Sequence, residues 1–164
     1  ILCFRQIRVW KDTISVVSNA IDNGYYFNGI VFMGRGVAYG DLGRQQEAIE
    51  DFSRAIEVNP TMRDAYKFRG SLYAQAGQMD LALADLNKYV TMDSADVVTW
   101  NNIAMIYMRK QQLPQALEAF TKTIQLKPDA VVSYQNRARV YEMMGNIEMM
   151  QADLRKAQEV RGEK

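Results

Sequence analysis

Residues 63–96 read RDAYKFRGSLYAQAGQMDLALADLNKYVTMDSAD, and the pattern of this stretch recurs along the chain every 34 residues. Its first half places Tyr66, Gly70 and Tyr73 four and then three residues apart, a spacing that puts them on one face of a helix. Its second half follows the same rule, and Gly77 stands between the two halves. Because a helix often ends at a residue with a positive φ, which glycine adopts readily, the stretch predicts two helices that break near Gly77.

The recurrence defines four consecutive repeats, each with a first helix (helix A) and a second helix (helix B). With Gly29 as the first repeat position, they span 29–62, 63–96, 97–130 and 131–164 without a gap. The fourth position holds Phe32, Tyr66, Trp100 and Tyr134, the eighth holds Gly36, Gly70, Ala104 and Ala138, and the fifteenth holds Gly43, Gly77, Gln111 and Gly145. A fixed period of this length marks a chain of stacked supersecondary units, so the sequence predicts tandem helix pairs.

Small residues and prolines indicate how the helices of a repeat pack and where they stop. Glycine or alanine at the eighth position and alanine at the twentieth let helices A and B approach closely. Pro60 and Pro128 stand at the thirty-second position, where proline ends helix B because it cannot donate a backbone hydrogen bond. Ser94 and Gly162 depart from the pattern there, and Met150 replaces the alanine of the fourth repeat, which is the most degenerate.

This pattern resembles the tetratricopeptide repeat over residues 29–164. The resemblance implies an all-α fold, a right-handed superhelical solenoid of antiparallel helix pairs with about four and a half repeats. It also implies that helix A of each repeat lines a concave groove, through its positions 2, 5, 6, 9, 12 and 13.

Residues 1–28 are expected to be part of a preceding repeat, with its helix B at about residues 10–23 and residues 1–8 as the stub of its helix A. The expected helix B carries an apolar stripe at helical spacing, formed by Trp10, Ile14, Val17 and Ile21. An incomplete first repeat predicts that the array extends upstream. Both ends of the array are therefore expected to leave an apolar face without a polar capping helix.

Three arginines recur at the seventh repeat position: Arg35, Arg69 and Arg137. We interpret them as packing groups between repeats, with the aliphatic stem buried and the guanidinium head hydrated.

Composition excludes several classes of protein. The chain has no histidine, which removes histidine-based catalysis and metal sites, and its one cysteine, Cys3, permits no internal disulfide. A formal charge of +1 argues against nucleic-acid binding. The sequence shows no catalytic motif and no apolar run long enough for membrane insertion. We therefore expect no enzyme activity and no cofactor. The single cysteine favours the cytoplasm, and an oxidising compartment stays open.

The expected groove is apolar in the first repeat and rich in amides and cations in the third and fourth. Asn102 and Asn136 share the sixth position, and successive asparagines there resemble the asparagine ladder of the O-linked N-acetylglucosamine transferase repeats. An asparagine amide can donate to a peptide carbonyl and accept from a peptide N–H. The candidate peptide-binding residues are Lys67, Phe68, Asn101, Asn102, Met105, Arg109, Asn136 and Arg139.

The sequence therefore predicts a protein–protein interaction scaffold that binds a peptide or helix of a partner protein in its concave groove. Two alternatives stay open. The repeats could instead self-associate end to end, giving a homodimer through the uncapped ends, which a monomer across a wide concentration range would exclude. The chain could also be the targeting or regulatory arm of a larger enzyme.

Overall fold

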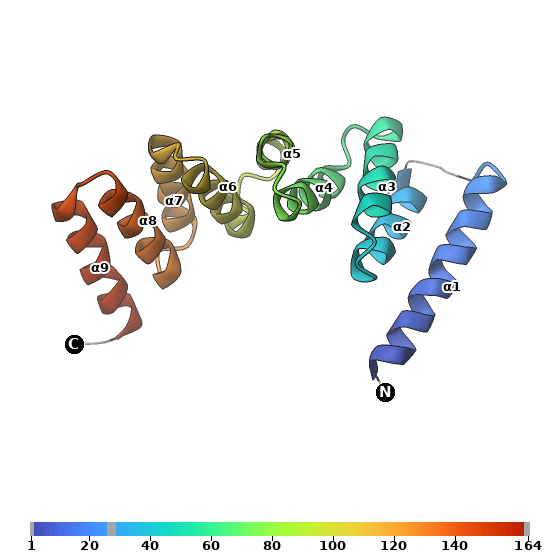
Figure 1. The fold of residues 1–164 in the computed structure, drawn as a ribbon, viewed down its shortest axis with the longest axis horizontal. Coiled ribbons are helices and arrows are strands. Elements are labelled where there is room, and N and C mark those ends of the chain that lie inside the picture. Colours follow the sequence, from blue (N-terminus) through green and yellow to red (C-terminus); the bar gives the residue numbers. More distant parts are fainter. Residues whose placement is uncertain (1, 26–28, 163–164) are drawn as a thin grey trace. The chain divides into compact units, whose positions relative to one another are not determined.

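The computed structural model describes the backbone of residues 2–25 and 29–162, and the side chains of residues 11–25 and 29–162. All regular structure in these ranges is helical, which confirms the predicted all-α class (Figure 1). The helices are α1 (Leu2–Asp22), α2 (Ile30–Asp41), α3 (Gln45–Val58), α4 (Arg63–Gln75), α5 (Met79–Met92), α6 (Val97–Arg109), α7 (Leu113–Leu126), α8 (Val131–Met143) and α9 (Ile147–Arg161).

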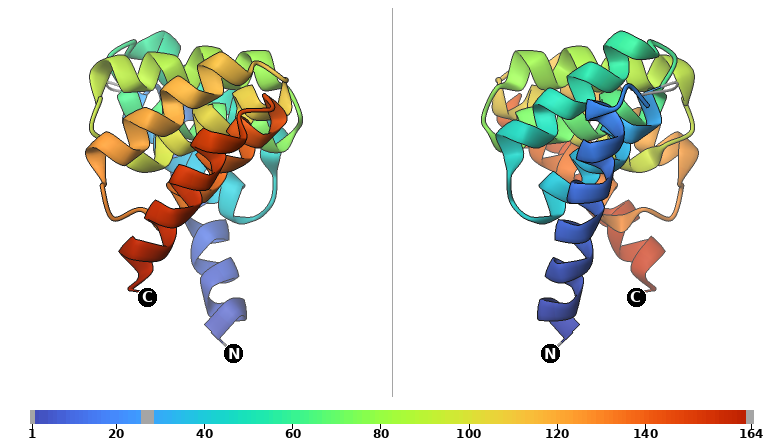
Figure 2. Two further views of the ribbon diagram at one scale, coloured as in Figure 1. Left: turned by 90° about the vertical axis from the view of Figure 1, so that its left-hand side faces the viewer. Right: turned by 90° about the vertical axis from the view of Figure 1, so that its right-hand side faces the viewer.

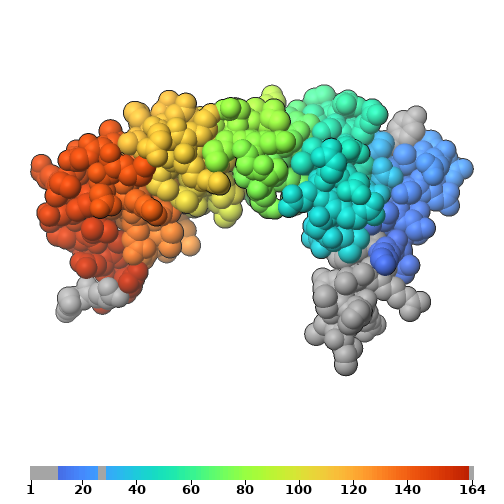
Figure 3. Space-filling view, viewed as in Figure 1, coloured from blue at the N-terminus to red at the C-terminus, as the bar shows by residue number. Residues whose placement is uncertain are grey.

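The chain divides into two compact units, Ile1–Tyr89 and Val90–Lys164, and the boundary falls inside α5. In the first unit α1 packs on α2, α2 pairs with α3, and α3 packs on α4. In the second unit α6 pairs with α7, α7 packs on α8, and α8 pairs with α9, and these helices touch along the visible face (yellow to red in Figure 3). Helix pairs within each unit thus follow the chain order that the repeat predicts.

The N-terminal segment differs from its prediction. One unbroken helix, α1, covers Leu2–Asp22 (blue in Figure 2), so residues 2–8 form no separate helix stub and the helix starts well before residue 10. The physical reason is that residues 2–9 contain neither glycine nor proline to end a helix. Ile14, Val17 and Ile21 are half-buried as expected, whereas the side chain of Trp10 lies outside the described residues.

In the first two repeats, the close approach of the two helices requires glycine at the eighth position. A Cβ atom on Gly36 would lie 2.8 Å from Cε1 of Phe52, a fully packed side chain of α3. A Cβ atom on Gly70 would lie 3.0 Å from side-chain atoms of Asp85 and Leu86 on α5. The third and fourth repeats accept alanine there, and Ala104 is completely buried.

The break between helices A and B has the predicted backbone conformation. Gly43, Gly77 and Gly145 have φ values of 74°, 76° and 73°. Gln111 takes the same place in the third repeat with a φ of 59°, a conformation that costs a residue with a Cβ atom. The turn is therefore set by the fold and not by glycine alone.

The recurring arginines are bonded at their heads, so the interpretation of a hydrated guanidinium is wrong. Arg69 donates from Nε and Nη2 to both carboxylate oxygens of Asp85, at 2.7 and 2.8 Å, and from Nη1 to Oγ of Ser53 at 2.9 Å. The same arrangement joins Arg35 to Asp51 and Ser18, and Arg137 to Asp153 and Thr121. Each arginine thus forms a clamp: its hydrogen bonds to the aspartate join the two helices of its own repeat, and a third hydrogen bond joins it to the helix before them.

These ion pairs are strong because both side chains of each pair are largely shielded from water. The side chain of Asp85 is 8% exposed and that of Arg69 is 18% exposed. Hydrogen bonds to Asp85 raise the pKa of the Arg69 guanidinium, and this effect outweighs the desolvation that lowers it. Arg35 and Arg137 show the same direction of pKa change, for the same reason. The three guanidinium groups therefore stay charged.

The third repeat replaces the clamp with an apolar pair. Ile103 stands where the other repeats have arginine, and Ala119 stands where they have aspartate. Both are buried, at 1% and 3% exposure. A well-packed apolar pair can substitute for a buried ion pair without loss of stability, because it avoids the desolvation of two charges.

Candidate functional site

The candidate site consists of the exposed and half-buried face of helix A in the third and fourth repeats, namely α6 and α8. Asp96 caps the N-terminus of helix α6, and its side chain accepts hydrogen bonds from the backbone N–H groups of Val98 and Thr99. This cap fixes the start of α6 although the preceding loop lacks the usual proline. Six of the eight predicted residues lie on these two helices: Asn101, Asn102, Met105, Arg109, Asn136 and Arg139.

The two amides of the predicted ladder are accessible and unused. Asn102 and Asn136 are half-buried. Neither side chain forms a hydrogen bond with any residue in the described part of the chain. Each amide therefore keeps its two N–H donors and its carbonyl acceptor for a ligand or for water.

Cations and a thioether extend this face toward the C-terminal ends of the helices. Arg109 and Arg139 are exposed, and neither has an ion-pair partner within residues 11–25 or 29–162. Met105 is half-buried between the amide position and Arg109. The face thus has amide groups that can form hydrogen bonds in its middle and positively charged arginines toward one end.

An open groove of about 410 Å³ lies at the opposite, N-terminal ends of α6 and α8, and Asn101 is part of its lining. Val98 and Val132, both at the second repeat position, line it as well and are 62% and 61% exposed. Lys127 and Asp129 from the connecting loop complete its polar edge. The groove therefore presents the aliphatic side chains of Val98 and Val132 next to the amide of Asn101.

The remaining two predicted residues belong to the other compact unit and are engaged internally. The ammonium of Lys67 lies 5.1 Å from the ring centroid of Tyr89, a cation–π contact. Phe68 stacks on Phe52 with ring centroids 5.6 Å apart, although Phe68 remains 43% exposed. These contacts give both residues a packing role within the first unit.

Sequence reasoning left Val98 and Val132 out of the candidate residues. Their signal was present, because an exposed aliphatic residue recurs at the second position, where Ile30 is 65% exposed. In the described residues there is no cluster of three aspartate, glutamate, histidine or cysteine side chains that could hold a metal ion. No helix in the described ranges combines the length and the apolar character needed to cross a membrane.

Solved structures with the same fold include a MamA protein, with 23% identity and a TM-score of 0.80 over 95% of this chain and 86% of that chain. MamA from Desulfovibrio magneticus RS-1 has 18% identity and a TM-score of 0.76, over 95% of both chains. YrrB, described as a TPR protein with an unusual peptide-binding site, has 19% identity and a TM-score of 0.85, over 98% and 82%. At these identities the likeness establishes the fold alone.

No curated protein matches the sequence. Two sequence models of the tetratricopeptide repeat match it in alternation, one at residues 30–62 and 97–130 and the other at 64–96 and 131–164. These matches cover most of the chain and agree with its helix pairs. The chain therefore belongs to the tetratricopeptide repeat family and folds as an all-α helical repeat solenoid.

Proposed function

We propose that this protein is a non-enzymatic interaction scaffold that binds an extended peptide of a partner protein on the faces of α6 and α8. The family membership supports a scaffold, and YrrB supports a peptide ligand because it is a family member with a peptide-binding site.

The observation that carries the proposal is the pair of unused amides at Asn102 and Asn136. An extended peptide presents alternating N–H and C=O groups, and an asparagine amide can bond to both. Such contacts hold the peptide backbone and impose little selection on its side chains. The same two positions sit on neighbouring repeats, so successive amides can meet successive parts of one peptide.

Selection for particular peptides is expected from the two ends of the face. Val98 and Val132 would hold an aliphatic side chain in the groove beside Asn101. Arg109 and Arg139 would attract a carboxylate, an effect that weakens as salt is added. We therefore expect the bound segment to combine an aliphatic residue with an acidic one.

Selection from a random dodecapeptide library on the intact protein tests the proposal. The strongest binder is synthesised, and its affinity is measured by titration calorimetry for the wild type and for the triple variant Asn102→Ala/Asn136→Ala/Arg109→Ala. Loss of several hydrogen bonds at about 1 kcal/mol each predicts an affinity at least tenfold weaker in the triple variant.

The matched control removes the same side-chain types from the exposed face of α9: Gln151→Ala, Gln158→Ala and Arg155→Ala. This control should bind like the wild type, and circular dichroism should show unchanged helicity for both variants. Equal loss in both variants, or no loss in the first, would place peptide binding elsewhere.

A further inference from the structure

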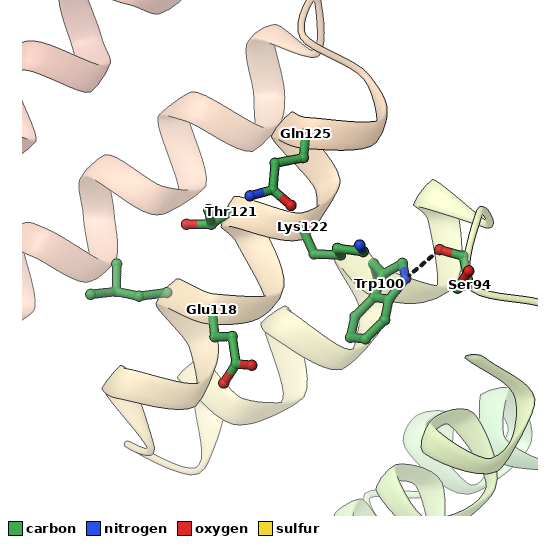
Figure 4. A pocket seen from close by; sticks show the side chains of 7 residues that line it. Ser94, Trp100, Glu118, Thr121, Lys122 and Gln125 are labelled. Atoms are coloured by element: carbon green, nitrogen blue, oxygen red, sulfur yellow. Dashed lines mark hydrogen bonds between the residues drawn. The ribbon is translucent and has the colours of Figure 1, made fainter. Parts of the chain in front are cut away.

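A second pocket, of about 570 Å³, lies beside α7 (Figure 4). It shares no lining residue with the groove at Asn101. Trp100 from α6 and Ser94 from the preceding loop form one side of it, while Glu118, Lys122 and Gln125 approach it from α7. The proposed peptide-binding face does not use this pocket.

Three departures from the repeat pattern meet in this pocket. Ser94 stands at the thirty-second position, where the first and third repeats have proline, so no pyrrolidine ring occupies that side. Trp100 provides an indole at the fourth position, where the other repeats have phenylalanine or tyrosine. Gln125 stands at the twenty-ninth position, where the first and fourth repeats have glutamate. The pocket therefore differs in chemistry from the equivalent surfaces of the neighbouring repeats.

The indole is held in place by its own hydrogen bond. Nε1 of Trp100 donates to the carbonyl oxygen of Ser94 at 3.0 Å (Figure 4). The second repeat makes the corresponding bond from the hydroxyl of Tyr66 to the carbonyl oxygen of Pro60, at 3.3 Å. Because the polar edge of the indole is satisfied, its ring serves as a fixed apolar wall.

The cation of this pocket lacks the glutamate partner that its counterparts in the first and fourth repeats have. The twenty-sixth position is cationic in every repeat, and Arg54 and Lys156 each pair with a glutamate three residues later at 2.9 Å. In the third repeat that glutamate is replaced by Gln125. Lys122 is half-buried and has no ion pair with any residue of the described ranges. A carboxylate from a ligand can take the place of the missing glutamate.

We propose that this pocket binds a linear peptide through an aspartate or glutamate side chain that pairs with Lys122, with a neighbouring aliphatic side chain against Trp100 and Leu117. Gln125 can donate an additional hydrogen bond to the carboxylate. Glu118 would repel phosphate and a peptide carboxylate alike, but a peptide offsets that repulsion because its N–H groups can donate a hydrogen bond to Glu118. The lining therefore favours a peptide over an inorganic ion.

Fluorescence of Trp100 provides a direct test. The chain has two tryptophans, so Trp10→Phe leaves Trp100 as the single emitter. The probe is the acetylated and amidated pentapeptide Ala-Leu-Glu-Leu-Ala, and its control has glutamine in the central position. We expect a saturable change in Trp100 emission with the glutamate peptide and an affinity at least tenfold weaker with the glutamine peptide.

Variants made in the same background locate the effect. Lys122→Gln should weaken binding of the glutamate peptide at least tenfold, while Lys122→Arg should retain it. Ser94→Pro should also weaken binding by filling one side of the pocket, and proline is the natural residue at this position in two repeats. Lys88→Gln, at the same position of the second repeat and outside the pocket, is the matched control and should change nothing.

The proposal fails if the wild-type pocket gives no saturable signal, if both peptides bind equally, or if Lys122→Gln leaves binding unchanged. It also fails if the groove variant Asn102→Ala/Asn136→Ala/Arg109→Ala abolishes the signal. Because that variant should retain binding to the pocket and lose binding to the groove, failure here is distinguishable from failure of the proposed function.

Discussion

Gln111 has the backbone angle that glycine has at the same position of the other repeats. Its N–H still donates to the carbonyl oxygen of Met108 at 3.0 Å, and the next N–H, of Gln112, donates to Tyr107 at 2.9 Å. The turn is therefore complete, and the remaining cost is the contact of the Cβ atom with the backbone in a left-handed conformation.

Replacing Gln111 by glycine and Gly77 by glutamine should change the stability of the protein in opposite directions. Gln111→Gly should raise the free energy of unfolding by about 1 kcal/mol, because it relieves the left-handed strain. Gly77→Gln should lower it by about the same amount, since a Cβ atom there meets no other atom within 4 Å and only the backbone term changes. Urea unfolding followed by circular dichroism measures both. Two shifts of the same sign would refute the explanation.

At the scale of helices, the arginine clamps offer a comparison within one molecule. The second repeat joins α4 to α5 through Arg69 and Asp85, while in the third the equivalent positions of α6 and α7 hold the buried residues Ile103 and Ala119. The two solutions hold equivalent helix pairs. Removing one partner of an ion pair leaves a poorly solvated charge, whereas replacing both partners does not.

Asp85→Ala alone should therefore lower the free energy of unfolding by about 2–3 kcal/mol, because the Arg69 guanidinium loses its charged acceptor. The double variant Arg69→Ile/Asp85→Ala copies the third repeat and should regain most of that loss. Thermal unfolding of the intact chain provides the comparison. A double variant as unstable as the single one would mean that the ion pair itself holds the helices together.

The helix pairs could be predicted from the sequence because the period, the small residues and the turn glycines all describe local geometry. The clamp could not be predicted from helix periodicity, since Arg69, Asp85 and Ser53 stand on three helices. A signal existed, because each arginine precedes its aspartate by 16 residues. Asn102 and Asn136 could be predicted as candidate positions, but their lack of partners depends on every side chain around them.

At the scale of the whole chain, helices α1 to α4 of the first unit and α6 to α9 of the second pack against their neighbours in sequence. Stability in such an array is the sum of local terms and nearest-neighbour terms. The division into two compact units agrees with this local packing, because each unit has its own set of packed helices. A change in one unit should therefore remain confined to it.

Hydrogen exchange of the intact protein can test this local response with two equivalent variants. Asp51→Ala removes the clamp acceptor of the first repeat, and Asp153→Ala removes that of the fourth. A local loss of about 2–3 kcal/mol, as for Asp85→Ala, speeds exchange roughly 30- to 160-fold. We expect that increase in α2 and α3 for the first variant and in α8 and α9 for the second. A uniform increase along the chain in either variant would show global cooperativity instead.

Each clamp includes a hydrogen bond to the helix before it, so the contacts of a repeat depend on which repeat precedes it. Arg69 donates to the hydroxyl of Ser53 before it, and Arg137 donates to that of Thr121, whereas Ile103 follows a repeat that carries Asn87. In-frame deletion of the third repeat by recombination would place the guanidinium of the fourth against an asparagine. A repeat of this chain is thus matched to its predecessor, and duplication or shuffling of the gene would preserve the fold more easily than it would preserve these junctions.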